Sequence, residues 1–271
     1  MARARVGLRS VTSSVRPLPS FLIIGAQRAG TSSLYKYLEG HPGLAASVRK
    51  ETEYFSRRYG RGETWYRAHF PLLRGRLAYE ATPDYLFYPL SPERIRKTIP
   101  DARFVVLLRD PVERAYSHYR HMVRLGFEDL PFGEALTREP ERLSGDAARL
   151  ADDPLYEPRA FLRFSYVSRG LYAEQFRRWF SWFPPSRFLV IQSERLFEDP
   201  KRAIVEIEQG IGARPWLPRD LRNHSYGTQR PPVPPIGGAE RHMLQERLRP
   251  EVQELERLLG RSFDWKLGDG G

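Results

Sequence analysis

The chain of 271 residues contains no cysteine, which excludes disulfide bonds and thiolate metal sites. The absence suits a reducing compartment, and we expect a cytoplasmic protein. No run of about 18 apolar residues is present, so the sequence predicts no membrane-spanning helix. Residues 1–19 are basic and serine-rich without the apolar stretch of a secretory signal, and we expect a mobile basic arm, with a transit peptide as the alternative.

Lysine is scarce, because only five of the 44 basic residues are Lys and Arg supplies the rest. With 33 acidic residues the net charge is +11. Guanidinium groups bind phosphate and sulfate through two hydrogen bonds, although a GC-rich genome produces the same bias. A basic surface attracts nucleic acid, anionic lipid or acidic glycan. The chain has no nucleic-acid motif, so we expect no nucleic-acid partner, and contact with an anionic surface stays open, as does the oligomeric state.

Hydrophobic residues make up 41% of the chain and aromatic residues 13%, which indicates a globular protein. Apolar runs alternate with helical patterns, which predicts an α/β class: a P-loop-like three-layer fold with a central parallel sheet flanked by helices. We expect a single domain over residues 20–271. Within it, the polar stretch at about 126–165 is expected to be a helical insertion or a mobile cover.

The segment 21–34 is the most informative part of the chain. Four apolar residues lead into Gly25, the chain turns, and Thr31 opens an amphipathic helical pattern. A strand, a tight loop and a helix start together form an anion site, although a purely structural turn is the alternative. The loop nearly matches a Walker A motif, but Thr31 stands where that motif has lysine. The cation lies inside the loop as Arg28, which indicates an anionic donor other than ATP–Mg.

A second segment, 103–117, contains five apolar residues, 104–108, that predict a buried parallel strand. Arg109 stands at the carboxyl end of this strand, Asp110 is a predicted helix N-cap, and Ser117 lies on the helix that follows. Ligands of open α/β sheets bind outside the carboxyl ends of the strands. We therefore expect Arg28 and Arg109 to converge on one ligand with two anionic groups. The alternative is a salt bridge for Arg109 and no special role for Ser117.

These two segments resemble the signature motifs of the sulfotransferases that use 3′-phosphoadenosine-5′-phosphosulfate (PAPS). Three more segments resemble the branch that holds the Golgi heparan sulfate sulfotransferases and their bacterial relatives. They are K-E-T-E-Y-F at 50–55, Y-E-A-T-P-D-Y at 79–85 and L-L-G-R-S-F-D-W at 258–265. The likeness runs from about Phe21 to Trp265. We expect a soluble bacterial-type enzyme without a stem and anchor of the Golgi type.

The resemblance implies PAPS as the donor and no metal. The acceptor would be a hydroxyl group, less readily an amine, of a glycan, glycolipid or secondary metabolite. The 3′-phosphate would be bound by Arg109 and Ser117. Tyr172 would touch the nucleotide or acceptor unless it is a core residue, and Arg230 would lie in a loop that closes over the donor. The 5′-phosphosulfate would be held by the first loop, at Gln27, Arg28, Ala29, Gly30, Thr31 and Ser32.

Glu51 is the expected catalytic base, because the resemblance places the family's catalytic glutamate there. It follows a short strand at 44–47 that we expect beside the 21–24 strand, near the mouth of the loop. Neighbouring Tyr54 and Phe55 would desolvate its carboxylate, whereas Lys50 would stabilise the charge. The alternative is a surface Glu51 paired with Lys50. Arg28 would stabilise charge on the bridging oxygen of the donor, at a position where this branch often has lysine.

Other interpretations compete with this one. His118 and His121, three residues apart on the helix after Arg109, are rival bases. A P-loop kinase for a small molecule is a second candidate function, although Thr31 in place of lysine weakens it. A non-catalytic protein that binds polyanions through its basic surface is a third.

Overall fold

The computed structural model describes the chain except for residues 1–8, 73–74, 223, 225–233, 266 and 268–271. The chain forms two compact units. Unit 1 comprises residues 1–108 and 180–225, and unit 2 comprises residues 109–179 and 226–271. The single domain expected over residues 20–271 stays a prediction.

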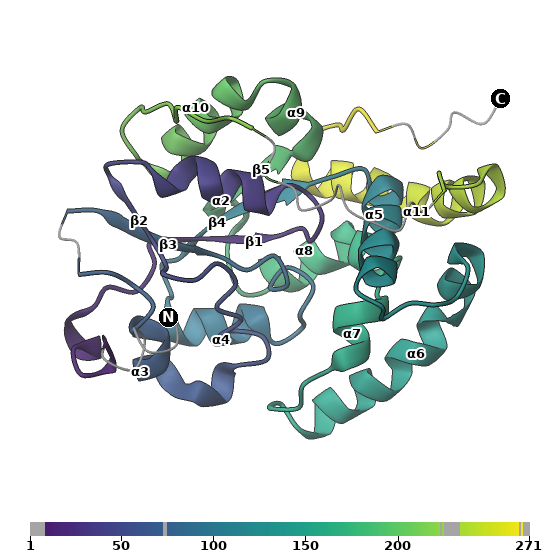
Figure 1. The fold of residues 1–271 in the computed structure, drawn as a ribbon, viewed down its shortest axis with the longest axis horizontal. Coiled ribbons are helices and arrows are strands. Elements are labelled where there is room, and N and C mark those ends of the chain that lie inside the picture. The colour runs from purple at the N-terminus through teal and green to yellow at the C-terminus, as the bar shows by residue number, and fades with distance from the viewer. Residues whose placement is uncertain (1–8, 73–74, 223, 225–233, 266, 268–271) are drawn as a thin grey trace. The chain divides into compact units, whose positions relative to one another are not determined.

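Unit 1 is built on a five-stranded sheet in which every pairing is parallel. The sheet has the strand order β2-β3-β1-β4-β5 (Figure 1). Each residue of the central strand β1 is buried, as expected for a parallel strand covered on both faces. The strands are β1 (Phe21–Gly25), β2 (Leu44–Ala46), β3 (Leu77–Ala81), β4 (Arg103–Leu108) and β5 (Phe188–Gln192).

The expectation that the strand at 44–47 lies beside β1 is wrong. β2 is the edge strand and pairs with β3, with Ala45 opposite Ala78, and β3 occupies the place beside β1. β3 has five residues and is largely buried, whereas β2 has only three. The longer buried strand takes the interior position, and the short one forms the edge.

Helices cover both faces of this sheet, which confirms the α/β fold class. α2, α9 and α10 lie above the sheet in Figure 1, and α3 and α4 lie below it. The buried residues of α2 include Leu34 and Leu38, one turn apart on one helix face. The helices are α2 (Thr31–Glu39), α3 (Gly62–Arg67), α4 (Ser91–Thr98), α9 (Ser193–Glu198) and α10 (Pro200–Ile211), with 3-10 turns at Ser13–Val15, Tyr59–Arg61 and Pro185–Arg187.

The described part of the expected mobile arm is packed on unit 1. Arg16 is 8% exposed, and its Nη1 donates a hydrogen bond of 2.7 Å to the Phe70 carbonyl. Arg67 in turn donates to the Arg16 carbonyl at 2.8 Å. These contacts tie Arg16, in the segment before β1, to residues 67–70. The mobile arm expected over residues 1–19 stays a prediction.

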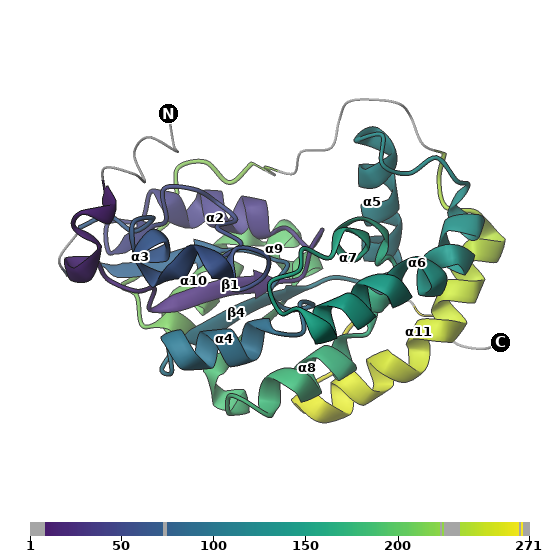
Figure 2. The same ribbon diagram turned by 90° about the horizontal axis from the view of Figure 1, so that it is seen from below.

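Unit 2 is helical, and the stretch expected as an insertion or cover forms α6 and α7, as seen from below in Figure 2. Two acidic residues of α6, Glu139 and Asp146, are buried acceptors, whereas most of its other polar residues are exposed. Glu139 accepts from the Val167 and Ser168 amides at 2.7 and 2.8 Å, which ties the chain after α7 to α6. The helices are α5 (Pro111–Arg124), α6 (Phe132–Asp152), α7 (Arg159–Phe164), α8 (Tyr172–Phe180, its last residue in unit 1) and α11 (Gly238–Leu259), with a 3-10 turn at Ser168–Gly170.

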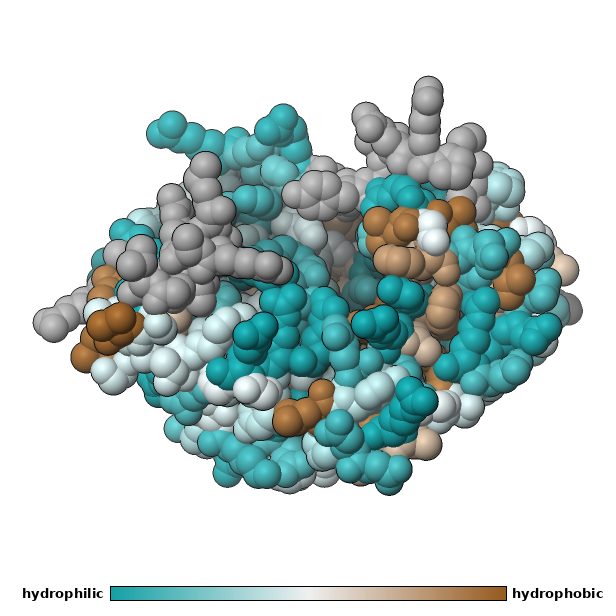
Figure 3. All heavy atoms as spheres, turned by 60° about the horizontal axis from the view of Figure 1, so that its bottom comes forward, coloured by the Kyte–Doolittle hydropathy of each residue, from teal (hydrophilic) through white to brown (hydrophobic). Residues whose placement is uncertain are grey.

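Hydrophilic side chains dominate the face of the molecule drawn in Figure 3, and hydrophobic ones show in separate patches. Among the described residues, none of the helices combines the length and apolar character needed to cross a bilayer.

Candidate active site

The loop between β1 and α2 has the geometry of an anion cradle. Gly30 has φ 92° and precedes the first residue of α2, and a Cβ atom there would lie 2.8 Å from Phe197 Cζ. Only glycine meets both conditions. Arg28 also lies in the left-handed region, with φ 70°. The loop ends at the N-terminus of a nine-residue helix, where backbone N–H groups and the helix dipole favour an anion.

This cradle is buttressed by residues that the sequence analysis missed. Ser193, the first residue of α9, donates from Oγ to the Ala29 carbonyl at 2.8 Å. The Ala26 amide donates to Leu107 of β4 at 2.6 Å. The Gln27 side-chain oxygen is buried without a hydrogen-bond partner among the described residues. An amide that can rotate to offer its N–H groups suits a loop whose polar contacts are completed by an anionic ligand.

Glu51 lies in a strained turn that follows β2. Glu51 has φ 63° and Glu53 has φ 58°, both left-handed and unusual for residues with a side chain. The Glu51 amide donates to the Ala81 carbonyl at 2.9 Å, which fixes the turn at the carboxyl end of β3. Backbone strain of this kind clusters at functional sites.

The Glu51 carboxylate is 44% exposed and lies 2.5 Å from Lys50 Nζ. The expected desolvation by Tyr54 and Phe55 does not bury it. Both aromatic rings are buried, and Tyr54 stacks on Tyr66 with the ring centroids 4.4 Å apart. Glu51 is thus ion-paired, as in the surface alternative, and also held at the carboxyl edge of the sheet.

The segment after β3 joins the Glu51 turn to the phosphate loop. Within it, Thr82 and Leu86 donate their amides to Ile23 and Ile24 of β1 at 3.0 and 2.8 Å. Unit 1 therefore places the Arg28 loop and the Glu51 turn at the carboxyl ends of neighbouring strands. This is the edge of the sheet where open α/β proteins bind ligands.

A buried carboxylate that sequence reasoning did not single out supports the same turn. Glu80 is fully buried in β3 and accepts from Thr52 Oγ1 at 2.5 Å and from Tyr66 Oη at 2.6 Å. Burial raises the pKa of Glu80, and the hydrogen bonds from neighbouring hydroxyl groups oppose that rise. A glutamate inside an apolar strand, followed by Thr82 and Tyr85, was the available sequence signal.

Unit 2 places the predicted 3′-phosphate residues on α5 and directly before it. Asp110 caps this helix as predicted, because its Oδ1 accepts from the Val112 amide at 2.8 Å. Glu113 Oε2 lies 4.0 Å from Arg109 Nη2, and Glu113 Oε1 accepts from Arg241 Nη2 at 2.7 Å. Ser117 follows Glu113 by one helical turn. Glu113 and Ser117 therefore lie on one face of α5, and Arg109, which precedes the helix, lies near Glu113.

The remaining candidates take different places. Tyr172 is 1% exposed and donates from its hydroxyl to the Arg109 carbonyl at 3.0 Å, so it packs in the core of unit 2 and supports Arg109. His118 is fully buried, with its ring 5.0 Å from that of Tyr166, and His121 Nδ1 lies 2.6 Å from Arg124 Nη2. The His118 ring is fully buried, which weakens it as a base for an acceptor that enters from solvent. Arg230 lies outside the described residues.

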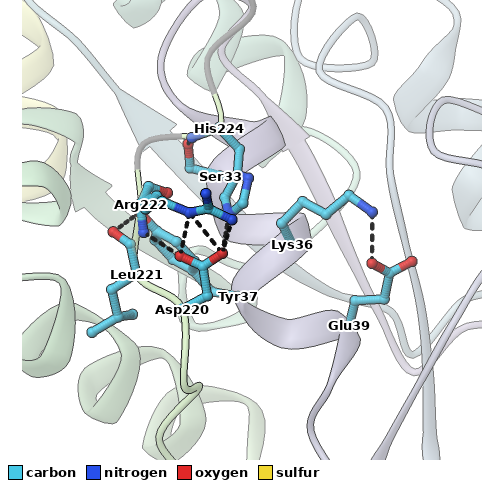
Figure 4. A network of polar contacts seen from close by, with 8 residues as sticks. All are labelled: Ser33, Lys36, Tyr37, Glu39, Asp220, Leu221, Arg222 and His224. Carbon is cyan, nitrogen blue, oxygen red and sulfur yellow. Dashed lines mark hydrogen bonds and ion pairs between the residues drawn. The ribbon is translucent and has the colours of Figure 1, made fainter.

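Leu221, Arg222 and His224 contact α2 (Figure 4). The His224 amide donates to Ser33 Oγ at 2.9 Å. Tyr37 donates from its hydroxyl to the carbonyls of Leu221 and Arg222 at 3.0 and 3.1 Å. This segment therefore reaches the first turn of α2, next to the phosphate loop.

No cluster of three or more His, Asp or Glu side chains in the described part of the chain is suited to hold a metal ion.

Comparisons with known proteins agree with this geometry. Residues 18–224 match the family model described as "Sulfotransferase domain". Heparan sulfate glucosamine 3-O-sulfotransferase 6 of Homo sapiens is 30% identical, over 92% of this chain and 74% of that protein. Bifunctional heparan sulfate N-deacetylase/N-sulfotransferase 3 of Homo sapiens is 31% identical, over 73% of this chain and 23% of that protein.

Among solved structures, a sulfotransferase from Alicyclobacillus acidocaldarius has a TM-score of 0.75 and 31% identity, with 91% of this chain and 98% of that chain covered. The strand–loop–helix cradle, the sheet and the match over residues 18–224 lead to one assignment. The chain belongs to the sulfotransferase family, and this membership implies PAPS as the sulfuryl donor.

Proposed function

We propose that this sulfotransferase transfers the sulfuryl group of PAPS to a hydroxyl group of a glycan, with Glu51 as the base that takes the hydroxyl proton. The observation that carries the proposal is the placement of two left-handed residues, Arg28 and Glu51, at the carboxyl ends of the neighbouring strands β1 and β3. One supplies a cation and the other a carboxylate. Transfer to a hydroxyl group requires both.

Arg28 and the N-terminus of α2 would hold the 5′-phosphosulfate. Negative charge grows on the bridging oxygen as its bond to sulfur breaks, and a fixed guanidinium stabilises that charge. Loss of one such preorganised donor costs about 2.7–4 kcal/mol in oxyanion holes. Arg28 stays protonated at any ordinary pH, so its role here is electrostatic.

Glu51 suits the role of base because its carboxylate is accessible yet held on a fixed turn. The exposed fraction of 44% leaves room for an acceptor, and the bond from the Glu51 amide to Ala81 anchors its backbone. Lys50 Nζ lies 2.5 Å from the carboxylate and pairs with it.

Arg109 and Ser117 would bind the 3′-phosphate of the donor. Glu113, between Arg109 and Arg241, would hold Arg109 in place. Tyr172 would fix the same residue through its carbonyl.

A hydroxyl acceptor is favoured over an amine because a relative that aligns with 92% of this chain is named for 3-O-sulfation of glucosamine. The relative named for N-sulfation keeps the amine as the second candidate. The net charge of +11 suits an acidic glycan. A glycolipid or secondary metabolite is the remaining class. We keep a cytoplasmic location as part of the proposal, to be tested by cell fractionation.

The test measures formation of adenosine 3′,5′-bisphosphate from PAPS, with heparan sulfate and 4-nitrophenol as probe acceptors. Glu51→Gln should lower kcat by about 10²–10⁴-fold, the usual contribution of a positioned base, with donor affinity kept. Glu39→Gln is the matched control, because Glu39 is a similarly exposed carboxylate paired with Lys36 at 2.7 Å. Wild-type turnover in Glu51→Gln would refute the role of Glu51. Turnover with 4-nitrophenol but not with heparan sulfate would refute a glycan as the acceptor.

A further inference from the structure

Glu80 is a carboxylate that the proposed chemistry does not use, and it is fully buried. A buried carboxylate is costly unless hydrogen bonds compensate its lost hydration. Four hydroxyl groups surround it: Thr52 Oγ1 at 2.5 Å, Tyr66 Oη at 2.6 Å, Thr82 Oγ1 at 3.0 Å and Tyr85 Oη at 3.1 Å. A strand that needed only to pack would carry an apolar residue at this position.

One of these hydroxyl groups belongs to the turn that carries Glu51. Thr52 lies between Glu51 and Glu53, the two residues with positive φ, and is itself fully buried. Its hydroxyl donates to Glu80 and lies 3.3 Å from the Tyr54 amide, from which it accepts. The strained turn is thus bonded at its centre to a strand of the sheet.

We propose that Glu80 is a positioning residue, which through Thr52 holds the left-handed turn that presents the Glu51 carboxylate to the acceptor. The inference rests on the proposed role of Glu51 as the base.

Two-point attachment explains why this contact matters. The bond from the Glu51 amide to Ala81 fixes one point of the turn and still permits rotation about it. The bond from Thr52 to Glu80 fixes a second point on the same strand. Glu80 lies opposite Leu22 of β1, so the attachment is in register with the strand that leads into the phosphate loop.

Glu53 adds a third attachment from the other side of the turn. It pairs with Arg57 and lies 2.9 Å from Arg58 Nη2, and its amide donates to Thr82 Oγ1 at 3.4 Å. Thr82 donates in turn to Glu80. The Glu80 carboxylate therefore accepts a hydrogen bond from Thr52 in the turn, and through Thr82 it is also linked to Glu53.

Thr52→Val tests the link, since it keeps the shape of the side chain and removes its hydroxyl group. Thr52→Ser, in contrast, keeps the hydroxyl group. Tyr79→Phe is the matched control, because Tyr79 is a buried β3 residue whose hydroxyl donates to the Tyr35 carbonyl at 3.2 Å, away from the turn. The readouts are kcat with PAPS and heparan sulfate, the Kd of adenosine 3′,5′-bisphosphate, and hydrogen exchange of the peptide 50–58.

Thr52→Val should lower kcat by about 10–100-fold, since a misplacement of about 1 Å can cost 10²-fold. Its Kd for the bisphosphate should stay at the wild-type value, and exchange in 50–58 should be faster. Thr52→Ser should recover most of the turnover. Tyr79→Phe should lose stability without either change. Added to Glu51→Gln, Thr52→Val should cause no further loss of kcat.

Wild-type turnover and exchange in Thr52→Val would overturn the positioning role even where Glu51→Gln is inactive. Full turnover in Glu51→Gln would instead remove the base on which the inference rests. Where heparan sulfate is not accepted, exchange in 50–58 decides, because unchanged exchange in Thr52→Val refutes the attachment.

Discussion

The strain at Glu51 predicts opposite effects of two small substitutions on stability and activity. Glu51 has φ 63°, which an L-residue adopts at a cost of about 1–2 kcal/mol. Replacement by glycine removes that cost, whereas replacement by alanine keeps it. Both substitutions remove the carboxylate and its pairing with Lys50. The comparison of glycine with alanine therefore isolates the backbone term.

The expected difference follows from two opposing terms. Glycine recovers about 1–2 kcal/mol of left-handed strain and loses about 0.4–1 kcal/mol through the greater freedom of the unfolded chain. At the middle of both ranges, Glu51→Gly should therefore be more stable than Glu51→Ala by roughly 0.8 kcal/mol. A chain of this size shifts its Tm by about 2–4 °C per kcal/mol, so the expected difference in Tm is about 1–4 °C.

The assay is thermal unfolding of both variants in one buffer, followed by circular dichroism, together with PAPS turnover. Both variants should be inactive, since neither has a base. A Tm of Glu51→Gly equal to or below that of Glu51→Ala would refute the strained turn. Turnover in either variant would refute the role of Glu51 as the base.

Three further predictions concern the donor site and the buried carboxylate. Arg28→Lys should stay partly active and Arg28→Ala should be nearly inactive. In both variants kcat should fall more than donor affinity, because charge on the bridging oxygen grows only in the transition state. Equal losses in the two variants, confined to the Kd of the donor, would mean that Arg28 only holds the donor. Arg109→Ala should lose about 1.5–3 kcal/mol of binding per lost charge-assisted bond, and calorimetry with adenosine 3′,5′-bisphosphate that shows unchanged affinity would contradict the 3′-phosphate assignment. Burial raises the pKa of Glu80 above its ordinary value of 4.5. Between the unfolded and the folded pKa, the folded state therefore binds more protons than the unfolded state. This contribution to stability is present below pH 4.5 and is lost as pH rises through the folded pKa. The free energy of unfolding, measured with urea between pH 4 and 8, should decline with pH more in the wild type than in Glu80→Gln. The same pH dependence in both proteins would contradict the prediction.

The local elements of unit 1 were largely predictable from the sequence because their signals are local. The apolar run at 21–24 and the glycine at position 30 predict β1, the loop and α2, and the structure has all three. Asp110 before Pro111 predicts the start of α5, and its side chain caps that helix.

The order of the strands was harder to predict, because pairing depends on contacts distant in sequence. The short strand at 44–46 gave no sign that β3 would separate it from β1. α9 was missed because Ser193–Glu198 is one short helix directly after β5.

The role of Glu80 in the site was hidden for a similar reason. Its motif was visible at residues 79–85, but the partner Thr52 lies 28 residues away in the chain. Only the fold brings the two motifs together. The same holds for Ser193, which reaches back across the chain to Ala29.

The proposed function depends most directly on which ligand the loop at residues 26–30 binds. The decisive measurement is the thermal stabilisation of the wild-type protein by adenosine 3′,5′-bisphosphate, compared with ATP–Mg and with heparin. The bisphosphate at 100 times its Kd should add about 2.7 kcal/mol, and Gly30→Ala should remove most of that gain, since a Cβ atom there would lie 2.8 Å from Phe197. Equal or greater stabilisation by ATP–Mg, or stabilisation by heparin alone, would contradict the assignment of this loop as a PAPS site.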